Sequence, residues 1–168
     1  MDFHIGDTVV HWAYGPSEIV RQEEKSFSGS RKAYYVLRVG NMTIWVPADD
    51  ASHGSLRPPT SPNDFGRMFD ILRAPGDPLS ADRLERKSLL MERMKDGTLE
   101  SKCRVVRDLR AHSREKKLNE SDVLILEQAR NFLLSEWNLS LAVPRSQAED
   151  ELNQMLEISQ QGTPLPAA

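Results

Sequence analysis

Hydrophobic residues follow two different periods along the chain, and the change falls near residue 61. In the first sixty residues, short runs rich in Val, Ile, Tyr and Trp alternate with turn sequences that contain Gly, Asp and Asn. This is the pattern of short antiparallel strands, which it predicts at residues 7–12, 17–22, 33–39 and 42–47. Gly40 and Asn41 both tolerate positive φ and predict a tight hairpin. The pattern therefore predicts a small, strongly bent antiparallel sheet or partial barrel.

The last of these predicted strands places its side chains on two distinct faces. Because successive side chains alternate, one face, expected to pack on the core, carries Met42, Ile44 and Val46. The other face then carries Thr43 and Trp45. Exposed large aromatic side chains are frequent at protein contacts, so Trp45 is a candidate contact residue. The alternative is that the helical region of the same chain covers Trp45.

From residue 61 the apolar spacing becomes helical. Ser61 followed by Pro62 and an acid in the first turn is typical of a helix start. The helix predicted over residues 61–73 carries an apolar stripe at i, i+3, i+4 and i+7, formed by Phe65, Met68, Phe69 and Leu72. The sequence Ala-Pro-Gly-Asp-Pro at 74–78 ends this helix. Residues 61–78 are therefore interpreted as a connector helix and linker.

Further helices are predicted beyond this linker. One begins at Ser80 and ends at Gly97, a favourable residue just past a helix end, and the next covers residues 99–115. Asn119 with Asp122 predicts a third helix start, and the apolar positions of that helix are Val123, Leu126, Ala129, Leu133 and Trp137.

A capping-box pattern at Ser146–Glu149 predicts the start of a last helix, with apolar positions Leu152, Met155 and Leu156. The predicted organisation is an α+β chain. Residues 1–60 form a β domain, 61–78 the connector, 79–160 a compact helical domain and 161–168 a disordered tail.

Charge is unevenly distributed along the 168 residues. The net charge of −3 argues against a protein that coats nucleic acid by charge alone. Residues 83–117, however, contain twelve Lys and Arg against six Asp and Glu, whereas residues 146–168 contain four acids and no base. The N-terminus has no leader pattern and no run approaches 18 apolar residues. We expect a soluble, cytoplasmic protein.

The residues give little support to catalysis. The four histidines are scattered without metal-ligand spacing, and glycines form no phosphate-binding loop. His11, in an apolar strand, is interpreted as a packing residue, and Cys103, on the apolar side of its helix, as a buried structural thiol. The adjacent pair Asp49 and Asp50 is more typical of a loop or cap than of an acid–base pair. No enzyme activity, metal or cofactor is expected.

Basic residues on two successive helices make nucleic-acid binding the better-supported chemistry. On the helix at 99–115, three arginines project within an arc of roughly 80°: Arg104, Arg107 and Arg114. The preceding helix adds Arg83, Arg86 and Lys87. Such a group can hold two or three phosphates without contacting bases. The alternative is a solvated face with ion pairs between residues four apart, for which Glu100 and Arg104 qualify.

An ordered set of fragments resembles the CarD/CdnL/TRCF family of bacterial transcription regulators. The fragments are FHIGDTVVHWAYGPSEI, YYVLRV, VPADDA, LRAP and VVRDLRA…LNESD…LEQARNFLLSEW, spanning residue 3 to about 157. The resemblance implies a Tudor-like β domain that docks on the β subunit of RNA polymerase. It also implies a helical bundle that contacts promoter DNA at the upstream edge of the melted region and stabilises the open complex. A monomer associated with the nucleoid is expected.

The resemblance places the polymerase contact on the outer face of the sheet, at Lys25, Thr43 and Trp45. Two departures from the family pattern stand out. Trp45 occupies a position where relatives carry a basic residue, and no aromatic residue lies between 80 and 100, where relatives carry a tryptophan wedge beside the position of Arg83. The alternative function is therefore a polymerase-docked protein–protein adaptor without wedge-type DNA contact.

Overall fold

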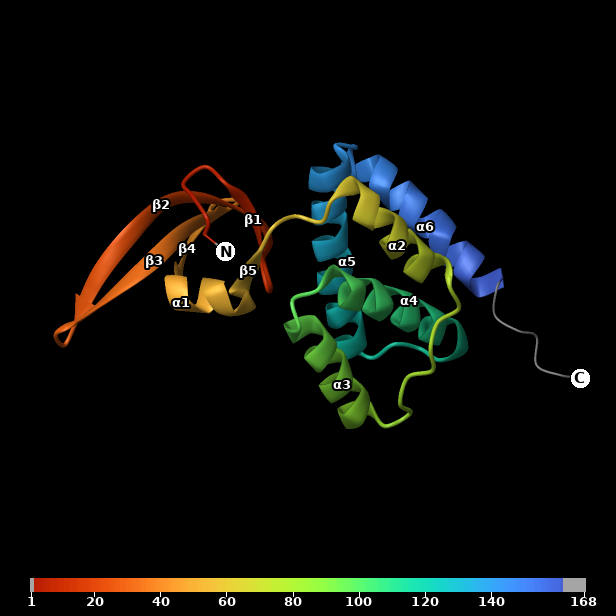
Figure 1. Cartoon of the computed structure of the whole chain (residues 1–168). Helices are drawn as coiled ribbons and strands as arrows, with labels where there is room; N and C mark the ends of the chain where they lie inside the picture. Colours follow the sequence, from red (N-terminus) through yellow and green to blue (C-terminus); the bar gives the residue numbers. More distant parts are fainter. Residues whose placement is uncertain (1, 162–168) are drawn as a thin grey trace, which may run out of the picture. The chain divides into compact units, whose positions relative to one another are not determined.

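The computed structural model describes residues 2–161, and the backbone divides after Pro59 into two compact units, 1–59 and 60–168. The first is a β unit and the second a helical unit (Figure 1). The predicted tail at 161–168 lies, apart from its first residue, outside the described residues. The α+β class with an N-terminal antiparallel sheet is confirmed.

The β unit is built on a five-stranded antiparallel sheet in the order β4-β3-β2-β1-β5. Its strands are β1 (Thr8–His11), β2 (Gly15–Phe27), β3 (Ser30–Val39), β4 (Met42–Pro47) and β5 (Leu56–Arg57). A short helix α1 (Ala48–Asp50) and a π-type turn η1 (Ala51–Ser55) connect β4 to β5.

The hairpin of β2 and β3 is longer than the rest of the sheet, and Figure 1 shows it as a curved ribbon. Ser28 and Gly29 both have positive φ, 48° and 84°, as a tight two-residue hairpin turn requires. Pairing of β3 with β4 stops at Tyr34 and Pro47, so the end of the ribbon has two strands only. Both faces of that end are exposed to solvent, so its sequence shows no alternation of apolar and polar residues. For this reason the sequence pattern placed the end of β2 five residues too early.

One face of the sheet carries the core of the β unit. Its buried members are Phe3, Val9, Ile19, Leu37, Val46, Ala51 and Leu56. Of the three β4 residues expected in this core, Val46 is buried and Ile44 is half-buried, but Met42 is 50% exposed. Met42 is the first residue of β4 and pairs with Val39 at the end of the hairpin, so it lies at the margin of the core.

His11 is a structural residue of the β1–β2 turn. Its side chain is 8% exposed, and Nδ1 accepts the backbone N–H groups of Ala13 and Tyr14 at 3.1 and 3.3 Å. Burial lowers the pKa of His11, so the ring is neutral at pH 7 and carries its proton on Nε2. The expected packing role is confirmed.

The helical unit contains α2 (Pro62–Arg73), α3 (Arg83–Lys95), α4 (Leu99–Glu115), α5 (Glu120–Leu141) and α6 (Arg145–Gln161). Helix α4 is central, because α2, α3, α5 and α6 all pack against it (Figure 1). Trp137 of α5 is fully buried and its ring lies 4.9 Å from that of Phe69 in α2. Among the described helices, none is both long and apolar enough to cross a membrane.

Helix α2 belongs to the helical unit, whereas the sequence suggested a connector. Its start is as expected, because the Ser61 side chain accepts the backbone N–H of Asp64. Phe65, Met68 and Leu72 are fully buried, and α2 packs against α4 and α6. A helix with three of its four stripe residues fully buried is part of a core, so the boundary falls before it.

Two predicted helix starts need correction. Helix α3 begins after Asp82, whose carboxylate accepts two backbone N–H groups, and Ser80 lies in the preceding loop. Helix α6 already begins at Arg145, with the N–H of Ala148 donating to the carbonyl of Pro144. The capping box predicted at Ser146 is therefore wrong, since the helix starts before it.

Helix α5 begins as predicted, with the Asn119 and Asp122 side chains each accepting the other's backbone N–H. One of its expected core positions differs. Val123 is 41% exposed, and Ile125 is buried instead. Asp122 belongs to the buried stripe, and Val123 projects about 100° further round the helix.

Candidate functional sites

Trp45 is held on the outer face of the sheet by two residues of β2. Its indole Nε1 donates a hydrogen bond to Glu23 Oε2 at 2.9 Å, and the Lys25 ammonium lies 4.7 Å from the ring centroid. The side chain remains 42% exposed. The indole therefore has a defined position and an accessible surface.

Strand geometry brings these residues together. Arg21, Glu23 and Lys25 are alternate residues of β2 and share one face. Glu23 lies directly opposite Tyr34 of β3. Val36, two residues along β3 and on the same face as Tyr34, lies opposite Trp45 of β4. We call the set Arg21, Glu23, Lys25, Tyr34, Thr43 and Trp45 the Trp45 surface.

Glu23 links Arg21 and Trp45 by accepting a hydrogen bond from each of them. Arg21 Nε donates to its other oxygen at 2.5 Å. Hydrogen bonds from Arg21 and Trp45 lower the pKa of Glu23, so the carboxylate stays ionised at neutral pH. An ionised acceptor makes a stronger hydrogen bond to the indole than a neutral one. Glu23 is thus the residue that orients Trp45.

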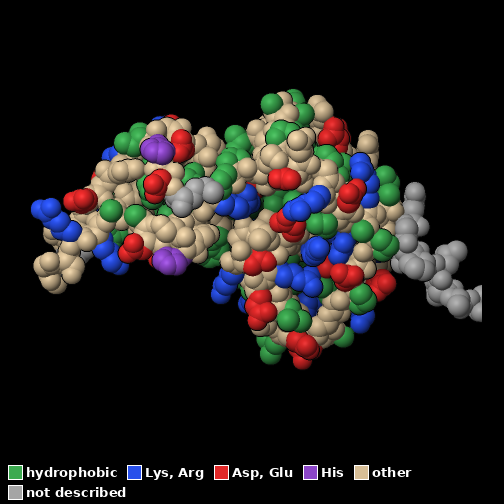
Figure 2. Space-filling view, viewed as in Figure 1, with side chains coloured by type: hydrophobic (Ala, Val, Ile, Leu, Met, Phe, Trp, Pro, Cys, Tyr) green, Lys and Arg blue, Asp and Glu red, His purple; other side chains and the backbone are tan. Residues whose placement is uncertain are grey.

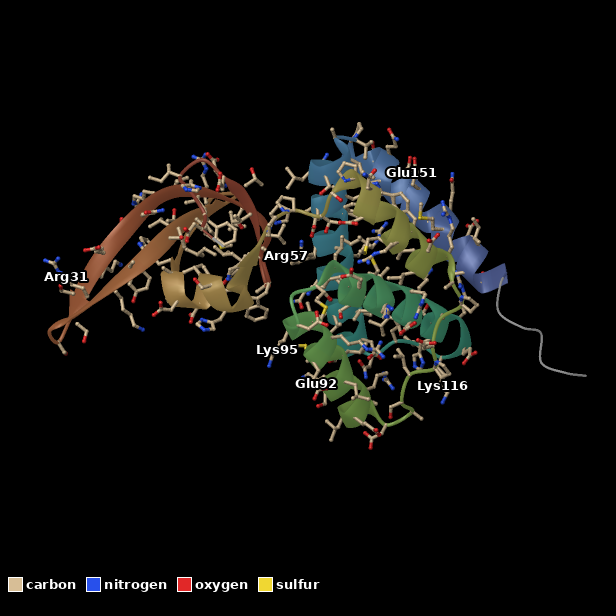
Figure 3. All side chains as sticks on the ribbon, in the orientation of Figure 1. Arg31, Arg57, Glu92, Lys95, Lys116 and Glu151 are labelled. Atoms are coloured by element: carbon tan, nitrogen blue, oxygen red, sulfur yellow. The ribbon has the colours of Figure 1, made fainter. Side chains whose placement is uncertain are left out.

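The first turns of α3 form a second candidate surface, where an exposed apolar side chain lies beside two cations. Arg83 and Lys87 are exposed, and Leu84 is 81% exposed. At about 100° per residue, both cations lie on one side of Leu84, within roughly 100° of it. The acids Glu85 and Glu92 lie on the other side. We call Arg83, Leu84 and Lys87 the α3 surface; Figure 3 shows Glu92 and Lys95 further along the same helix.

Arg86 does not belong to that surface. Its side chain is 5% exposed, and Nε and one terminal nitrogen bind both oxygens of Asp122 at 3.0 and 2.9 Å. The remaining terminal nitrogen donates to the carbonyl of Ser80. All three interactions are internal, so we assign Arg86 a structural role and exclude it from any DNA contact.

Arg107 is likewise internal. It is 7% exposed and donates to the carboxylates of Asp108 and Asp77, each at 3.0 Å. Asp108 also accepts the backbone N–H of Asp77 and a hydrogen bond from Arg93. This network fastens the loop between α2 and α3 to α4, which removes Arg107 from the predicted basic surface.

The other two arginines of the predicted α4 group are accessible to different degrees. Arg104 is exposed, and Arg114 is half-buried with one nitrogen donating to the carbonyl of Leu156. Burial and the neighbouring charge of Arg110 lower the pKa of Arg114. The anticipated partner of Arg104, Glu100, binds Arg67 of α2 at 2.7 Å instead. Figure 2 shows basic and acidic side chains intermingled over the visible face of the helical unit.

The thiol considered for chemistry in the sequence is not an exposed reactive group in the structure. Cys103 is completely buried, and burial raises the pKa of its thiol far above the ordinary value. Over residues 2–161, no cluster of three or more His, Cys, Asp or Glu side chains could hold a metal ion. The buried thiol agrees with the structural role inferred from sequence.

Four residues of these surfaces escaped the sequence analysis: Arg21, Glu23, Tyr34 and Leu84. Glu23 looked like one member of an acidic run, and only its reach to Trp45 across β3 identifies it. Leu84 lies two residues after the cap Asp82, in the first turn of α3. Its lack of an i+3 or i+4 apolar partner on the outer face was the available signal.

The chain thus combines a small β unit that presents an exposed tryptophan with a helical unit that presents a mixed apolar and basic helix start, and each is a candidate binding surface. Two family models match the chain: the CarD-like/TRCF RID domain over residues 3–59 and the CarD C-terminal domain over residues 67–153. The chain belongs to the CarD family, a family of transcription regulators. The resemblance stated from sequence is thereby confirmed.

A relative supports the same assignment. The Bacillus subtilis (strain 168) protein named "Putative transcription factor YdeB" is 31% identical over 151 residues, which cover 86% of this chain and 96% of the relative. The match spans both units, so the chain shares the order of units as well as the family.

Proposed function

We propose that this protein regulates transcription by binding the β subunit of RNA polymerase through the Trp45 surface and contacting promoter DNA through the α3 surface. In this way it stabilises the open promoter complex. It acts as a monomer in the cytoplasm, associated with the nucleoid. Family membership connects the chain with transcription, and the pinned, 42% exposed Trp45 is the observation that carries the docking half.

The chemistry of the Trp45 surface supports protein docking. A tryptophan contributes a large contact area with few rotatable bonds, and here Glu23 and Lys25 already restrict its rotamer. The entropy lost on binding is therefore small. Lys25 and Thr43, both on the same face, add a charge and a hydroxyl at the edge of the indole.

The docking half is tested with the full chain and purified polymerase β subunit. Trp45→Ala should weaken binding by at least tenfold, since interface tryptophans are typical hot spots of about 2 kcal/mol or more. Tyr14→Ala is the matched control, because Tyr14 is a 49% exposed aromatic residue of the same unit outside the Trp45 surface. Equal, small effects of both substitutions would refute the docking surface.

The DNA half relies on Arg83, Lys87 and Arg104, the members of the predicted basic set that are exposed, together with the half-buried Arg114. Backbone contacts from such residues position a protein without reading sequence. Leu84 extends beside Arg83 and is an apolar side chain of the type that inserts between base steps in the minor groove. Leu84 would then take the place of the missing aromatic wedge.

Salt dependence tests the DNA half. For polymerase with promoter DNA, contact with about three phosphates should make the log–log salt slope steeper by roughly 2.7 units when this protein is present. The double variant Arg83→Glu, Lys87→Glu should remove about two thirds of that increment. Arg145→Glu, an exposed arginine of α6 paired with Glu149, is the control and should leave the slope unchanged. An unaltered slope with the unmodified protein would eliminate the DNA contact.

The second candidate function is a polymerase-docked protein–protein adaptor. The burial of Arg86 and Arg107 favours it, because it reduces the cations available for phosphate. The Arg83→Glu, Lys87→Glu variant separates the two functions. Promoter occupancy in the presence of polymerase should fall if the α3 surface contacts DNA and should persist if that surface contacts another protein.

A further inference from the structure

Two lysines face each other near the turn of the β2–β3 hairpin. In the strand register Lys25 lies directly opposite Lys32, so both side chains project from the outer face, the face of Trp45. Like charges placed directly opposite each other on neighbouring strands destabilise a sheet. The arrangement therefore opposes folding unless something else compensates for it.

The other charges of this face are neutralised within the sheet. Arg21 pairs with Glu23 at 2.5 Å, and Arg38 pairs with Glu18 at 2.6 Å. Lys25 contacts aromatic rings, at 4.7 Å from the centroid of Trp45 and 5.8 Å from that of Tyr34. Within the described part of the chain, neither Lys25 nor Lys32 forms an ion pair with a carboxylate. Glu23 attracts Lys25 only at longer range and without a direct ion pair, so both lysines keep a charge available on the outer face.

The opposite face of the same ribbon is arranged differently. Arg31 is adjacent to Lys32 in β3 and so projects to the other side, where it pairs with Glu24 at 3.8 Å. Figure 3 shows Arg31 near the end of the ribbon. The unbalanced charge is thus confined to the outer face.

We propose that Lys32 is a docking residue of the Trp45 surface, and that the partner presents two carboxylates to Lys25 and Lys32 next to an apolar side chain that packs on Trp45. The proposal rests on the proposed function, in which the partner is the polymerase β subunit. It adds a residue and specifies the chemistry of the recognised surface as acidic. Binding of carboxylates removes the repulsion between the two lysines. The relief of this repulsion contributes to the free energy of binding and is gained only in the complex.

An acidic protein surface fits these positions better than nucleic acid does. Glu23 lies on the same face as the two lysines, two residues from Lys25, and its charge would repel a continuous phosphate backbone. The Lys25 ammonium already lies over the ring of Trp45, which leaves an edge of the indole suited to an aliphatic side chain. Two discrete carboxylates can pair with the lysines without approaching Glu23.

The test measures the affinity of full-length variants for purified polymerase β subunit. Lys32→Glu should weaken binding at least tenfold at low salt, and the loss should shrink as salt rises, because charge interactions are screened. Arg31→Glu is the matched control, with the same charge change one residue away on the other face, and should change affinity by no more than twofold. Equal effects of the two substitutions would overturn the proposal.

Stability measurements guard against a purely structural explanation. Lys32→Glu places a carboxylate opposite Lys25, so its Tm should be equal to or higher than that of the unmodified protein. A variant that binds more weakly while folding at least as well indicates a docking role. If Lys32→Glu lowers the Tm and weakens binding in proportion, the residue is structural and the proposal fails.

The outcomes also separate this proposal from the docking function itself. If Trp45→Ala abolishes binding but Lys32→Glu does not change it, the surface is correct and Lys32 is not part of it. If neither substitution matters, the proposed docking surface is wrong. If Lys32→Glu weakens binding to double-stranded DNA and leaves β-subunit binding intact, the partner is nucleic acid and the acidic-surface proposal is refuted.

Discussion

Replacement of Arg86 by methionine should destabilise the helical unit severely. Arg86 makes two hydrogen bonds to the 2% exposed Asp122 and one to the carbonyl of Ser80. Removing one partner of a buried pair leaves the other charge uncompensated, at a cost of about 3–5 kcal/mol. Asp122 also accepts the backbone N–H of Asn119 in the α5 capping box, so misplacement of its carboxylate adds about 1 kcal/mol.

Urea unfolding followed by circular dichroism at 222 nm measures this cost, because the long helices of the described chain all lie in the helical unit. Lys87→Met is the matched control, since Lys87 is the exposed neighbour of Arg86, and it should alter the free energy of unfolding by less than about 0.5 kcal/mol. A double variant Arg86→Met, Asp122→Leu should recover most of the loss, because apolar replacement of a whole buried pair is often near neutral.

The same pair predicts a pH dependence. Burial by itself raises the pKa of Asp122, but hydrogen bonds from Arg86 and from the Asn119 backbone outweigh it and hold the pKa below its ordinary value. A carboxylate with a lowered folded-state pKa contributes stability that is present above its unfolded pKa of about 4 and is lost as pH falls through the folded pKa. Arg86→Met should reduce this loss of stability at acid pH, the acid limb of the curve of unfolding free energy against pH. A cost below about 1 kcal/mol, with the acid limb unchanged, would refute this account of Arg86.

Three further predictions follow from burial and close packing. Gly76→Ala should destabilise the helical unit by about 1–3 kcal/mol, because the added Cβ would lie 2.6 Å from the Cβ of Ala111. Gly66→Ala should instead stabilise it by about 0.5–1 kcal/mol, because Gly66 lies within α2 with open space around it. Urea titrations of the two variants compare these effects directly. The lowered pKa of His11 predicts that the β unit loses stability as pH falls below about 6.5, a loss that His11→Gln should remove from a thermal-melt pH series. Cys103 should resist thiol reagents at pH 8 in native protein and react fully in urea, and rapid native labelling would contradict its burial.

The elements whose signals are local could be predicted from sequence. The Ser61 cap, the Asn119 capping box and the Gly40 turn each depend on residues within three or four positions, and such interactions form whatever the rest of the chain does. Periodicity likewise predicted α4 within its observed limits, because its apolar stripe is long. The candidate contact residue Trp45 followed from strand alternation alone.

Errors occurred where a local signal competed with tertiary packing. Ser146 offers a capping box, yet α6 begins before it with its N-terminal turn on Pro144. Val123 has the spacing of a core residue, but α5 buries Asp122 and Ile125 and leaves Val123 exposed. In both cases a short local pattern did not match the face or turn that the packed helices use.

The nature of the basic residues is what only the tertiary structure could decide. By type and spacing, Arg86 and Arg107 equal Arg83 and Arg104, but their carboxylate partners Asp122 and Asp77 lie 36 and 30 residues away. The same holds for Lys25 and Lys32, which become neighbours only through the hairpin register. The sequence determined how many charges this protein carries and on which elements. The packing of distant segments determined which of those charges form ion pairs within the fold and which remain accessible to a partner.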